Sequence, residues 1–140
     1  MIVLDTNVVS EWMRPAPSEV VIEWVTRQIP TDLYLSTITE AEMRFGAELL
    51  PTGRRRDRLL TAIEVTLADD FAGRILPFDR AAAQAYAGIA AYRRAAGRPI
   101  RESDCQIAAI ALSRGASVAT RNVKDFEDCG VHVINPWQSG

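Results

Sequence analysis

Acidic side chains recur where short apolar segments of the sequence end, and their chemistry suits a divalent cation. Carboxylates held within a few ångströms of one another repel and raise each other's pKa, so a persistent cluster implies a cation between them. Oxygen donors without cysteine or histidine favour Mg²⁺, with Mn²⁺ as a substitute, because zinc sites use sulfur or imidazole ligands. The candidate side chains are Asp5, Glu42, Asp104, Asn122 and Asp125.

Each acid also has an ordinary structural interpretation. Asp5 can form a turn after a strand, as aspartate often does. Thr39 and Glu42 fit the T-x-x-E capping box, in which the glutamate bonds back to the amide of the capping residue. Asp104 fits the first turn of a helix, where an acid complements the helix dipole, and Asp125 fits a solvated loop or a short helical turn. The functional interpretation depends on all of them lying together.

Short strands alternate with helices along the chain. Ser18 and Asp79 are expected to cap helices, and Gly115 is expected to end one. Apolar runs rich in β-formers predict strands at 2–4, 33–35, 75–77, 118–119 and 131–134. Apolar residues at helical spacing predict helices at 8–13, 18–29, 39–50, 53–71, 79–96 and 103–114.

This alternation predicts an α/β fold, a three-layer sandwich with a central, mostly parallel sheet of about five short strands. We expect residues 1–140 to form one domain, because a single core serves chains of this length. In open parallel sheets, ligands bind beyond the carboxyl ends of the strands. We therefore expect the acidic side chains to converge on one edge of the sheet.

The composition is that of a folded, soluble chain, with 48% hydrophobic and 24% charged residues. The formal net charge of −2 excludes a polycation, so nucleic-acid binding needs a local basic patch or a bridging metal. Cys105 and Cys129 form neither a disulfide framework nor a CxxC motif, which indicates a reducing compartment. The sequence shows no signal-peptide core and no run of about 18 apolar residues, so we expect a cytoplasmic protein without a membrane span.

Two surface features predict partners weakly. Apolar positions on the helices at 18–29 and 39–71 offer a place for self-association or for an amphipathic segment of a partner. Clustered arginines fit a phosphate-binding track, although a solvated helix face is the more common role of such a run. The arginines concerned are Arg54, Arg55, Arg56, Arg58, Arg93, Arg94, Arg98 and Arg101.

Several residues are expected to be structural. His132 alternates with valines in a predicted strand, which favours an exposed strand residue over a metal ligand. Cys105 has no nearby histidine to activate it and is expected to be a small buried side chain. The sequence contains no Walker loop and no GxGxxG motif, so nucleotide binding has no support. The residues expected to anchor the core or an interface are Trp12, Trp24 and Trp137.

Four segments of the sequence resemble the PIN-domain ribonucleases. The resemblance is closest to the VapC toxins of type II toxin–antitoxin systems, especially the FitB-like branch, to which segments 73–79 and 135–137 are also similar. It extends over essentially the whole chain in order. The four segments are 1–7, then 35–36 with 39–46, then Asp104 with 107–109, and finally 118–122.

The resemblance implies a Mg²⁺-dependent endoribonuclease that acts as a toxin by hydrolysing RNA. It also implies a cognate VapB- or FitA-like antitoxin that docks over the active site, and a homodimer within a toxin–antitoxin assembly that binds promoter DNA through the antitoxin. Asp5, Glu42 and Asp104 match the three central acids of the family, with Asp5 and Asp104 as direct metal ligands.

The fourth acidic position departs from the family pattern. Asn122 stands where a stricter pattern has an acid, and Asp125 is the next carboxylate. Asn122 can orient a water molecule but brings no charge. The expected mechanism also gives Thr6 and Thr120 hydrogen bonds to phosphate or to water at the metal, and gives Arg121 a contact with the RNA backbone.

Two other functions remain open at this point. A Mg²⁺-dependent phosphohydrolase of the haloacid-dehalogenase type also opens with an aspartate at a strand end, but it needs a second acid two residues later and a lysine deeper in the chain. Here position 7 is Asn7, and Lys124 is the only lysine. The non-enzymatic alternative is an RNA- or partner-binding module that keeps the fold but does not cleave.

Overall fold

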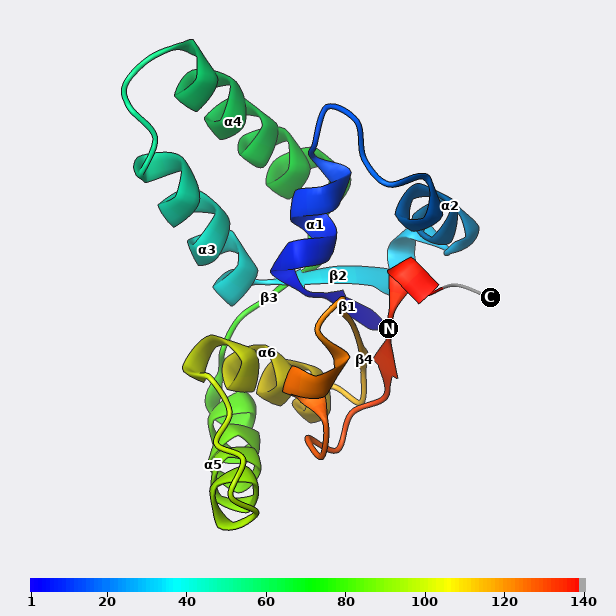
Figure 1. Ribbon diagram of the computed structural model, residues 1–140, viewed down its shortest axis with the longest axis vertical. Coiled ribbons are helices and arrows are strands. Elements are labelled where there is room, and N and C mark those ends of the chain that lie inside the picture. The colour runs from blue at the N-terminus through cyan, green and yellow to red at the C-terminus, as the bar shows by residue number, and fades with distance from the viewer. Residues whose placement is uncertain (139–140) are drawn as a thin grey trace.

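The computed structural model describes residues 1–138, which fold around a five-stranded parallel sheet (Figure 1). The strand order is β3-β2-β1-β4-β5, so the N-terminal strand lies at the centre. Val3 in β1 lies opposite Tyr34 on one side and Val118 on the other. The strands are β1 (Ile2–Leu4), β2 (Leu33–Ser36), β3 (Ile75–Leu76), β4 (Ser117–Ala119) and β5 (Val133–Ile134).

Six α-helices connect these strands. Asp79 caps α5 as predicted, because its Oδ1 accepts a hydrogen bond of 2.9 Å from the amide of Ala82. Gly115 follows α6 with a φ of 65°, the left-handed conformation in which glycine ends helices at low cost. The helices are α1 (Thr6–Trp12), α2 (Glu19–Arg27), α3 (Thr37–Glu48), α4 (Arg54–Val65), α5 (Arg80–Ala95) and α6 (Glu102–Ser113).

The sheet is buried on both faces, which explains why its strands are apolar runs and not alternating patterns. Successive residues of β1 enter opposite layers: Val3 packs with α5 and α6, whereas Leu4 packs with α1 to α4. Figure 1 shows these two helical layers on opposite sides of the strands. The predicted three-layer α/β sandwich is therefore confirmed.

Several predicted boundaries need correction. The helix after β2 begins at Thr37 and not at 39, because Ser36 caps it. The end of the predicted helix 53–71 is a π-helical turn, Thr66–Asp70, and β5 is two residues long instead of the four at 131–134. Ser18 precedes α2 but forms no side-chain capping bond, and its amide instead donates to Glu11 at 3.0 Å.

The expected structural residues are mostly confirmed. Cys105 and Cys129 are free and buried, and His132 is exposed. Trp24 is buried, and Trp12 and Trp137 pack against the core formed by α1 to α4. Arg93 is the exception among the arginines: only 6% of it is exposed, so it belongs neither to a phosphate track nor to a solvated helix face. Among residues 1–138, no helix combines the length and apolar character needed to cross a membrane.

Candidate active site

Asp5 is fixed at the carboxyl end of the central strand. Its amide donates to the carbonyl of Ala119 in β4 at 2.9 Å, which extends the sheet ladder by one residue. Its Oδ1 caps α1 by accepting a hydrogen bond of 2.8 Å from the amide of Thr6. Its Oδ2 accepts a hydrogen bond of 2.8 Å from the hydroxyl of Thr120. Only 5% of Asp5 is exposed. The carboxylate is thus held at the sheet edge by both neighbouring chain segments.

Glu42 faces the same edge from α3, but not as a capping residue. Its Oε1 accepts a 2.8 Å hydrogen bond from the Thr6 hydroxyl, and that hydroxyl lies 3.0 Å from the hydroxyl of Thr39. The amide of Thr39 is instead capped by Ser36 Oγ at 3.1 Å. The capping-box interpretation was therefore wrong, because the capping residue is Ser36, three positions before Thr39, and Glu42 lies in the second turn of the helix. A single residue, Thr6, links the second acid to the first.

Asp104 lies in the first turn of α6, as predicted, and is only 9% exposed. Burial and the negative charge of Asp5 raise the pKa of Asp104 to about 6. The nearest cation is exposed: Nε of Arg101 lies 3.9 Å from Asp104 Oδ2, with 71% of the arginine side chain accessible. A solvated arginine at this distance screens the charge weakly. Asp104 is therefore a buried acid without a close, desolvated counter-ion.

The pKa of Asp5 is also raised, chiefly by burial. Hydrogen bonds from Thr120 and Thr6 oppose the shift, whereas the charges of Glu42 and Asp125 add to it. Asp125 and Glu42 likewise raise the pKa of Asp104. The four acids from four separate segments thus form one electrostatic cluster, in which the ionised forms destabilise each other, and a bound cation would relieve this repulsion.

The structure distinguishes the two candidates for the fourth position. Asn122 is exposed, and across residues 1–138 only its backbone forms hydrogen bonds: its amide donates to Thr120 Oγ1 at 3.0 Å, and its carbonyl accepts from Asp125. Asp125 is half-buried in the 3₁₀ turn Val123–Phe126, and its charge acts on both buried acids. Asp125 is therefore the half-buried carboxylate whose charge reaches the two buried acids, whereas Asn122 contributes its backbone to the turn that carries Asp125.

Asn7 lies among these side chains, although it was not among the residues predicted for the site. Its Nδ2 lies 3.3 Å from Asp5 Oδ2 and 3.3 Å from Thr120 Oγ1, and its Oδ1 accepts from the amide of Arg121 at 3.3 Å. The available signal was its place two residues after Asp5, where an asparagine side chain folds back onto neighbouring chain. Arg121 is exposed beside the site and lies over the Trp137 ring at 5.1 Å.

The donor set fits a hard, hydrated cation. Every candidate side chain at this edge offers oxygen, and the raised pKa values of Asp5 and Asp104 mark negative charge that the protein itself does not neutralise. Within residues 1–138, no three side chains of His, Cys, Asp or Glu converge closely enough to ligate one ion together. Mg²⁺ is commonly held by one or two carboxylates with waters completing an octahedron. A pair of direct carboxylate ligands with water-mediated neighbours is consistent with this arrangement.

A groove of about 750 Å³ leads away from the acids between α1, α3 and α4. Thr6 and Glu42 lie in its wall next to the site, and apolar side chains such as Met43 and Leu59 form much of the remainder. Arginines add positive charge to this otherwise apolar surface. The basic residues lining the groove are Arg14, Arg55 and Arg58.

Comparisons with known proteins show the family and the fold of the chain. The PIN domain family matches residues 2–130. The chain is 48% identical to the plasmid stability protein StbB of Pseudomonas syringae, over 99% of this chain and 100% of that protein. It is 44% identical to the VapC ribonuclease Y4jK of Sinorhizobium fredii, over 99% of each. The crystal structure of FitAcB from Neisseria gonorrhoeae superposes with a TM-score of 0.93 at 45% identity, covering 99% of this chain and 100% of that one. A structure of FitAB bound to a DNA fragment also superposes with a TM-score of 0.93 at 45% identity, covering 100% and 98%.

Proposed function

Because the chain belongs to the PIN-domain family and, within it, to the VapC and FitB group of toxin ribonucleases, we propose that it cleaves RNA in a Mg²⁺-dependent hydrolysis that inhibits growth. Members of this family generally use divalent metal ions. The observation that carries the proposal is the cluster of Asp5, Glu42, Asp104 and Asp125 at the carboxyl edge of the sheet, with two buried acids of raised pKa. The proposal treats residues 1–140 as one nuclease domain acting in the cytoplasm.

We assign two of the acids as direct metal ligands and the other two to indirect roles. Asp5 and Asp104 are the direct ligands, since they are the most buried acids of the cluster and the charge of Asp5 raises the pKa of Asp104. Mn²⁺ has the same ligand preference as Mg²⁺ and would substitute for it. When bound, the ion supplies a Lewis acid that lowers the pKa of water and offsets charge on the scissile phosphate. Asp125 adds negative charge that acts on both of them.

The hydroxyl and amide groups hold the acids in place. Thr120 donates to Asp5 and accepts from the amide of Asn122, so its hydroxyl is already engaged, and we assign it to positioning Asp5 instead of binding phosphate. Thr6 directs Glu42 through Oε1. Glu42 would then orient the attacking water with its other oxygen and accept a proton from it as the water oxygen bonds to phosphorus. The bond from phosphorus to the leaving ribose oxygen breaks in the same displacement, and that oxygen takes a proton from solvent.

Exposed groups beside the acids would bind the substrate. The side chain of Arg121 is accessible, and its amide is anchored by Asn7, which places a cation next to the acidic cluster to receive an RNA phosphate. Asn122 offers an exposed amide at the same edge for a hydrogen bond to RNA or water.

The haloacid-dehalogenase alternative is disfavoured by Asn7. That enzyme class places an acid two residues after the first aspartate, whereas here the Asn7 amide is within hydrogen-bond distance of Asp5 and Thr120. The alignment with VapC ribonucleases over the full chain also favours the nuclease.

A cognate antitoxin of the VapB or FitA kind is the proposed partner. The support is the similarity to the toxin FitB and to the FitAB complex bound to DNA. We further propose a homodimer in an assembly that contacts promoter DNA through the antitoxin. We propose that an apolar antitoxin segment with acidic residues occupies the groove between α1, α3 and α4, where its acids would meet Arg14, Arg55 and Arg58.

Gly46 offers a direct test of this docking site. It is exposed on α3, it lines the groove, and a Cβ added there meets no atom within 4 Å. Gly46→Ala is therefore expected to stabilise the protein by about 0.5–1 kcal/mol, because alanine restricts the unfolded chain and favours helix. Gly46→Phe is expected to fill the groove and weaken antitoxin binding at least about tenfold, measured by calorimetry with thermal melts to verify folding.

Gly88→Phe is the matched control. Gly88 is exposed in α5, on the opposite face of the sheet, and a Cβ added there also meets no atom within 4 Å. Antitoxin affinity equal to that of the unmodified protein is expected for Gly88→Phe. Equal affinity in Gly46→Phe would show that the antitoxin docks elsewhere.

Expression in a bacterial host tests the proposed function as a whole. Induction of the unmodified protein is expected to stop growth, co-expression of the antitoxin to restore it, and Asp104→Asn to abolish toxicity, because the variant removes a metal ligand. Colony counts after induction, with immunoblots to match protein levels, give the measurement. Growth inhibition that persists in Asp104→Asn would favour a binding module that does not cleave.

A further inference from the structure

The turn that carries Asp125 lies outside the regular secondary structure. It follows β4 as the 3₁₀ turn Val123–Phe126 and continues through Asp128, which adopts a positive φ of 58°, to Gly130 at a φ of 78°. Phe126 is buried and anchors the turn on its apolar side. A second, polar anchor is needed, because a short turn with few ladder bonds would otherwise let the acid move relative to Asp5 and Asp104.

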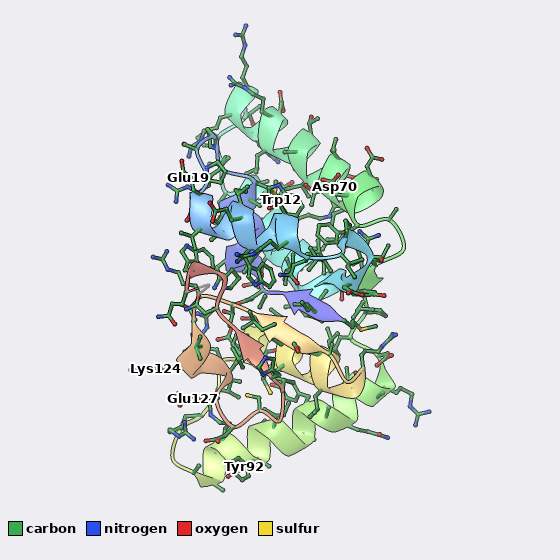
Figure 2. All side chains as sticks on the ribbon, turned by 90° about the vertical axis from the view of Figure 1, so that its right-hand side faces the viewer. Trp12, Glu19, Asp70, Tyr92, Lys124 and Glu127 are labelled. Carbon is green, nitrogen blue, oxygen red and sulfur yellow. The ribbon has the colours of Figure 1, made fainter. Side chains whose placement is uncertain are left out.

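Arg93 is that polar anchor. It comes from the last turn of α5, and only 6% of it is exposed. Its Nη1 donates to the carbonyls of Asp125 at 3.1 Å and Glu127 at 3.0 Å, and lies 3.7 Å from Sγ of Cys129. Its Nε donates to the carbonyl of Arg98 at 2.8 Å, in the segment that follows α5. Figure 2 shows this turn, marked by Lys124 and Glu127, beside the part of α5 that carries Tyr92.

The partners of Arg93 point to a role beyond packing. Burying a guanidinium is costly unless its donors are satisfied, and an aliphatic side chain would fill the same space more cheaply. Among residues 1–138, Arg93 forms no ion pair with a carboxylate, and its Nη1 donors meet only groups of the segment 125–129. The planar fork of arginine fixes two or more acceptors in a rigid arrangement, which lysine cannot reproduce.

We propose that Arg93 is a positioning residue that holds Asp125 at the acidic cluster by binding its backbone carbonyl. The inference rests on the proposed nuclease function and assigns a role in it to a residue that touches neither substrate nor metal. The same residue, Asp125, receives the Arg93 bond at its carbonyl and contributes its carboxylate to the cluster. The exposed ion pairs of Arg98 with Glu127 and Asp128 reinforce this connection at the surface.

A double-mutant cycle separates positioning from general stability. The variants are Arg93→Met, Asp125→Asn and their combination, with Arg94→Met as the control, because Arg94 is exposed one residue along the same helix. The readout is the Mg²⁺ concentration that gives half of the metal-induced rise in Tm, together with RNA cleavage. Loss of a supporting group typically weakens metal affinity 10- to 100-fold, so Asp125→Asn is expected to raise this midpoint about tenfold.

If Arg93 acts through Asp125, Arg93→Met raises the midpoint by a similar factor, and the double variant is no worse than either single one. Arg94→Met leaves the midpoint unchanged. Hydrogen exchange in metal-free Arg93→Met is expected to accelerate at residues 123–129 and not in α6. If Arg93→Met does not fold, Arg93→Lys serves instead, and it is expected to give a smaller shift of the same kind.

Two results would show that Arg93 is only structural and would overturn the inference. The first is that Arg93→Met and Asp125→Asn shift the Mg²⁺ midpoint additively in the double variant. The second is that Arg93→Met lowers Tm but leaves the Mg²⁺ midpoint unchanged. If Asp125→Asn itself has no effect, the positioning role also fails, while the nuclease proposal survives provided that cleavage still requires Asp5. Failure of the nuclease proposal is recognised separately, as cleavage that is absent from the unmodified protein.

Discussion

Asp5→Asn is expected to lower Mg²⁺-dependent RNA cleavage by about 1,000-fold or more, because a direct carboxylate ligand contributes to several kcal/mol of charge stabilisation in the transition state. The fold is expected to survive. Asparagine also caps helices well, and its carbonyl oxygen can still accept the bond that Asp5 receives from Thr6 or that from Thr120. Single-turnover cleavage of a defined RNA at saturating Mg²⁺, with Tm measured in parallel, gives the comparison.

Asp69→Asn is the matched control for charge removal. Asp69 is exposed on the π-helical turn Thr66–Asp70, away from the acidic cluster, so cleavage by this variant should equal that of the unmodified protein. Retention of more than about a tenth of the activity in Asp5→Asn would contradict the assignment of Asp5 as a metal ligand, since tenfold corresponds to only about 1.4 kcal/mol.

Asp104→Asn is expected to stabilise the protein when metal is absent. Burial and Asp5 raise the pKa of Asp104 to about 6 from a reference of 3.8, so the folded state binds a proton more tightly than the unfolded state does. The stability of the metal-free protein therefore falls as pH rises from about 4 to 6 and stays low above that range. The ionised carboxylate costs about 1–3 kcal/mol at pH 7.5 by this linkage, and removing it should raise Tm by about 5 °C or more.

The comparison uses EDTA-treated protein at pH 7.5 and pH 5.0. The stabilisation by Asp104→Asn should shrink at pH 5.0, where Asp104 is already largely protonated. At pH 7.5 with saturating Mg²⁺, the unmodified protein should have a higher Tm than Asp104→Asn, since the unmodified protein gains stability from the ion and the variant gains little. Equal Tm values in EDTA at pH 7.5 would show that Asp104 is not destabilised by its surroundings, and Asp69→Asn controls for the change in net charge.

The convergence of Asp5 and Asp104 followed from elementary rules. Apolar runs separated by helices require a parallel sheet, and the carboxyl ends of parallel strands meet at one edge. Asp5 directly follows β1, and Asp104 opens α6, which packs on the face of the same sheet. Both positions were therefore predictable without knowledge of side-chain contacts.

The hydrogen bond between Glu42 and Thr6 was not predictable in this way. Ser36 and Thr39 are both good N-cap residues three positions apart, so the local sequence allows the helix to begin after either one. Pairing of β2 with β3 continues through Ser36, which makes Ser36 the capping residue and moves Glu42 into the second turn. Tertiary pairing decided between two equally good local signals.

The burial of Arg93 could not be predicted from the sequence either. Arg93 and Arg94 are adjacent near the end of an alanine-rich helix, where cations commonly complement the helix dipole while remaining solvated. Only the packing of segment 123–129 against α5 distinguishes them, because it covers one arginine and leaves the other exposed. The same turn separates Asp125 from Asn122, because Asp125 is half-buried and its charge acts on Asp5 and Asp104, whereas Asn122 is exposed.

The most direct test of the central claim is cleavage of total cellular RNA by the purified protein with Mg²⁺, with excess EDTA, and with Asp5→Asn, followed by sequencing of the cut ends. We predict discrete cuts that require both the metal and Asp5, and whose flanking sequences identify the RNA target. Cleavage that persists in EDTA and in Asp5→Asn would contradict the metal-dependent mechanism. Intact RNA after incubation with folded, Mg²⁺-loaded protein would contradict the nuclease function itself.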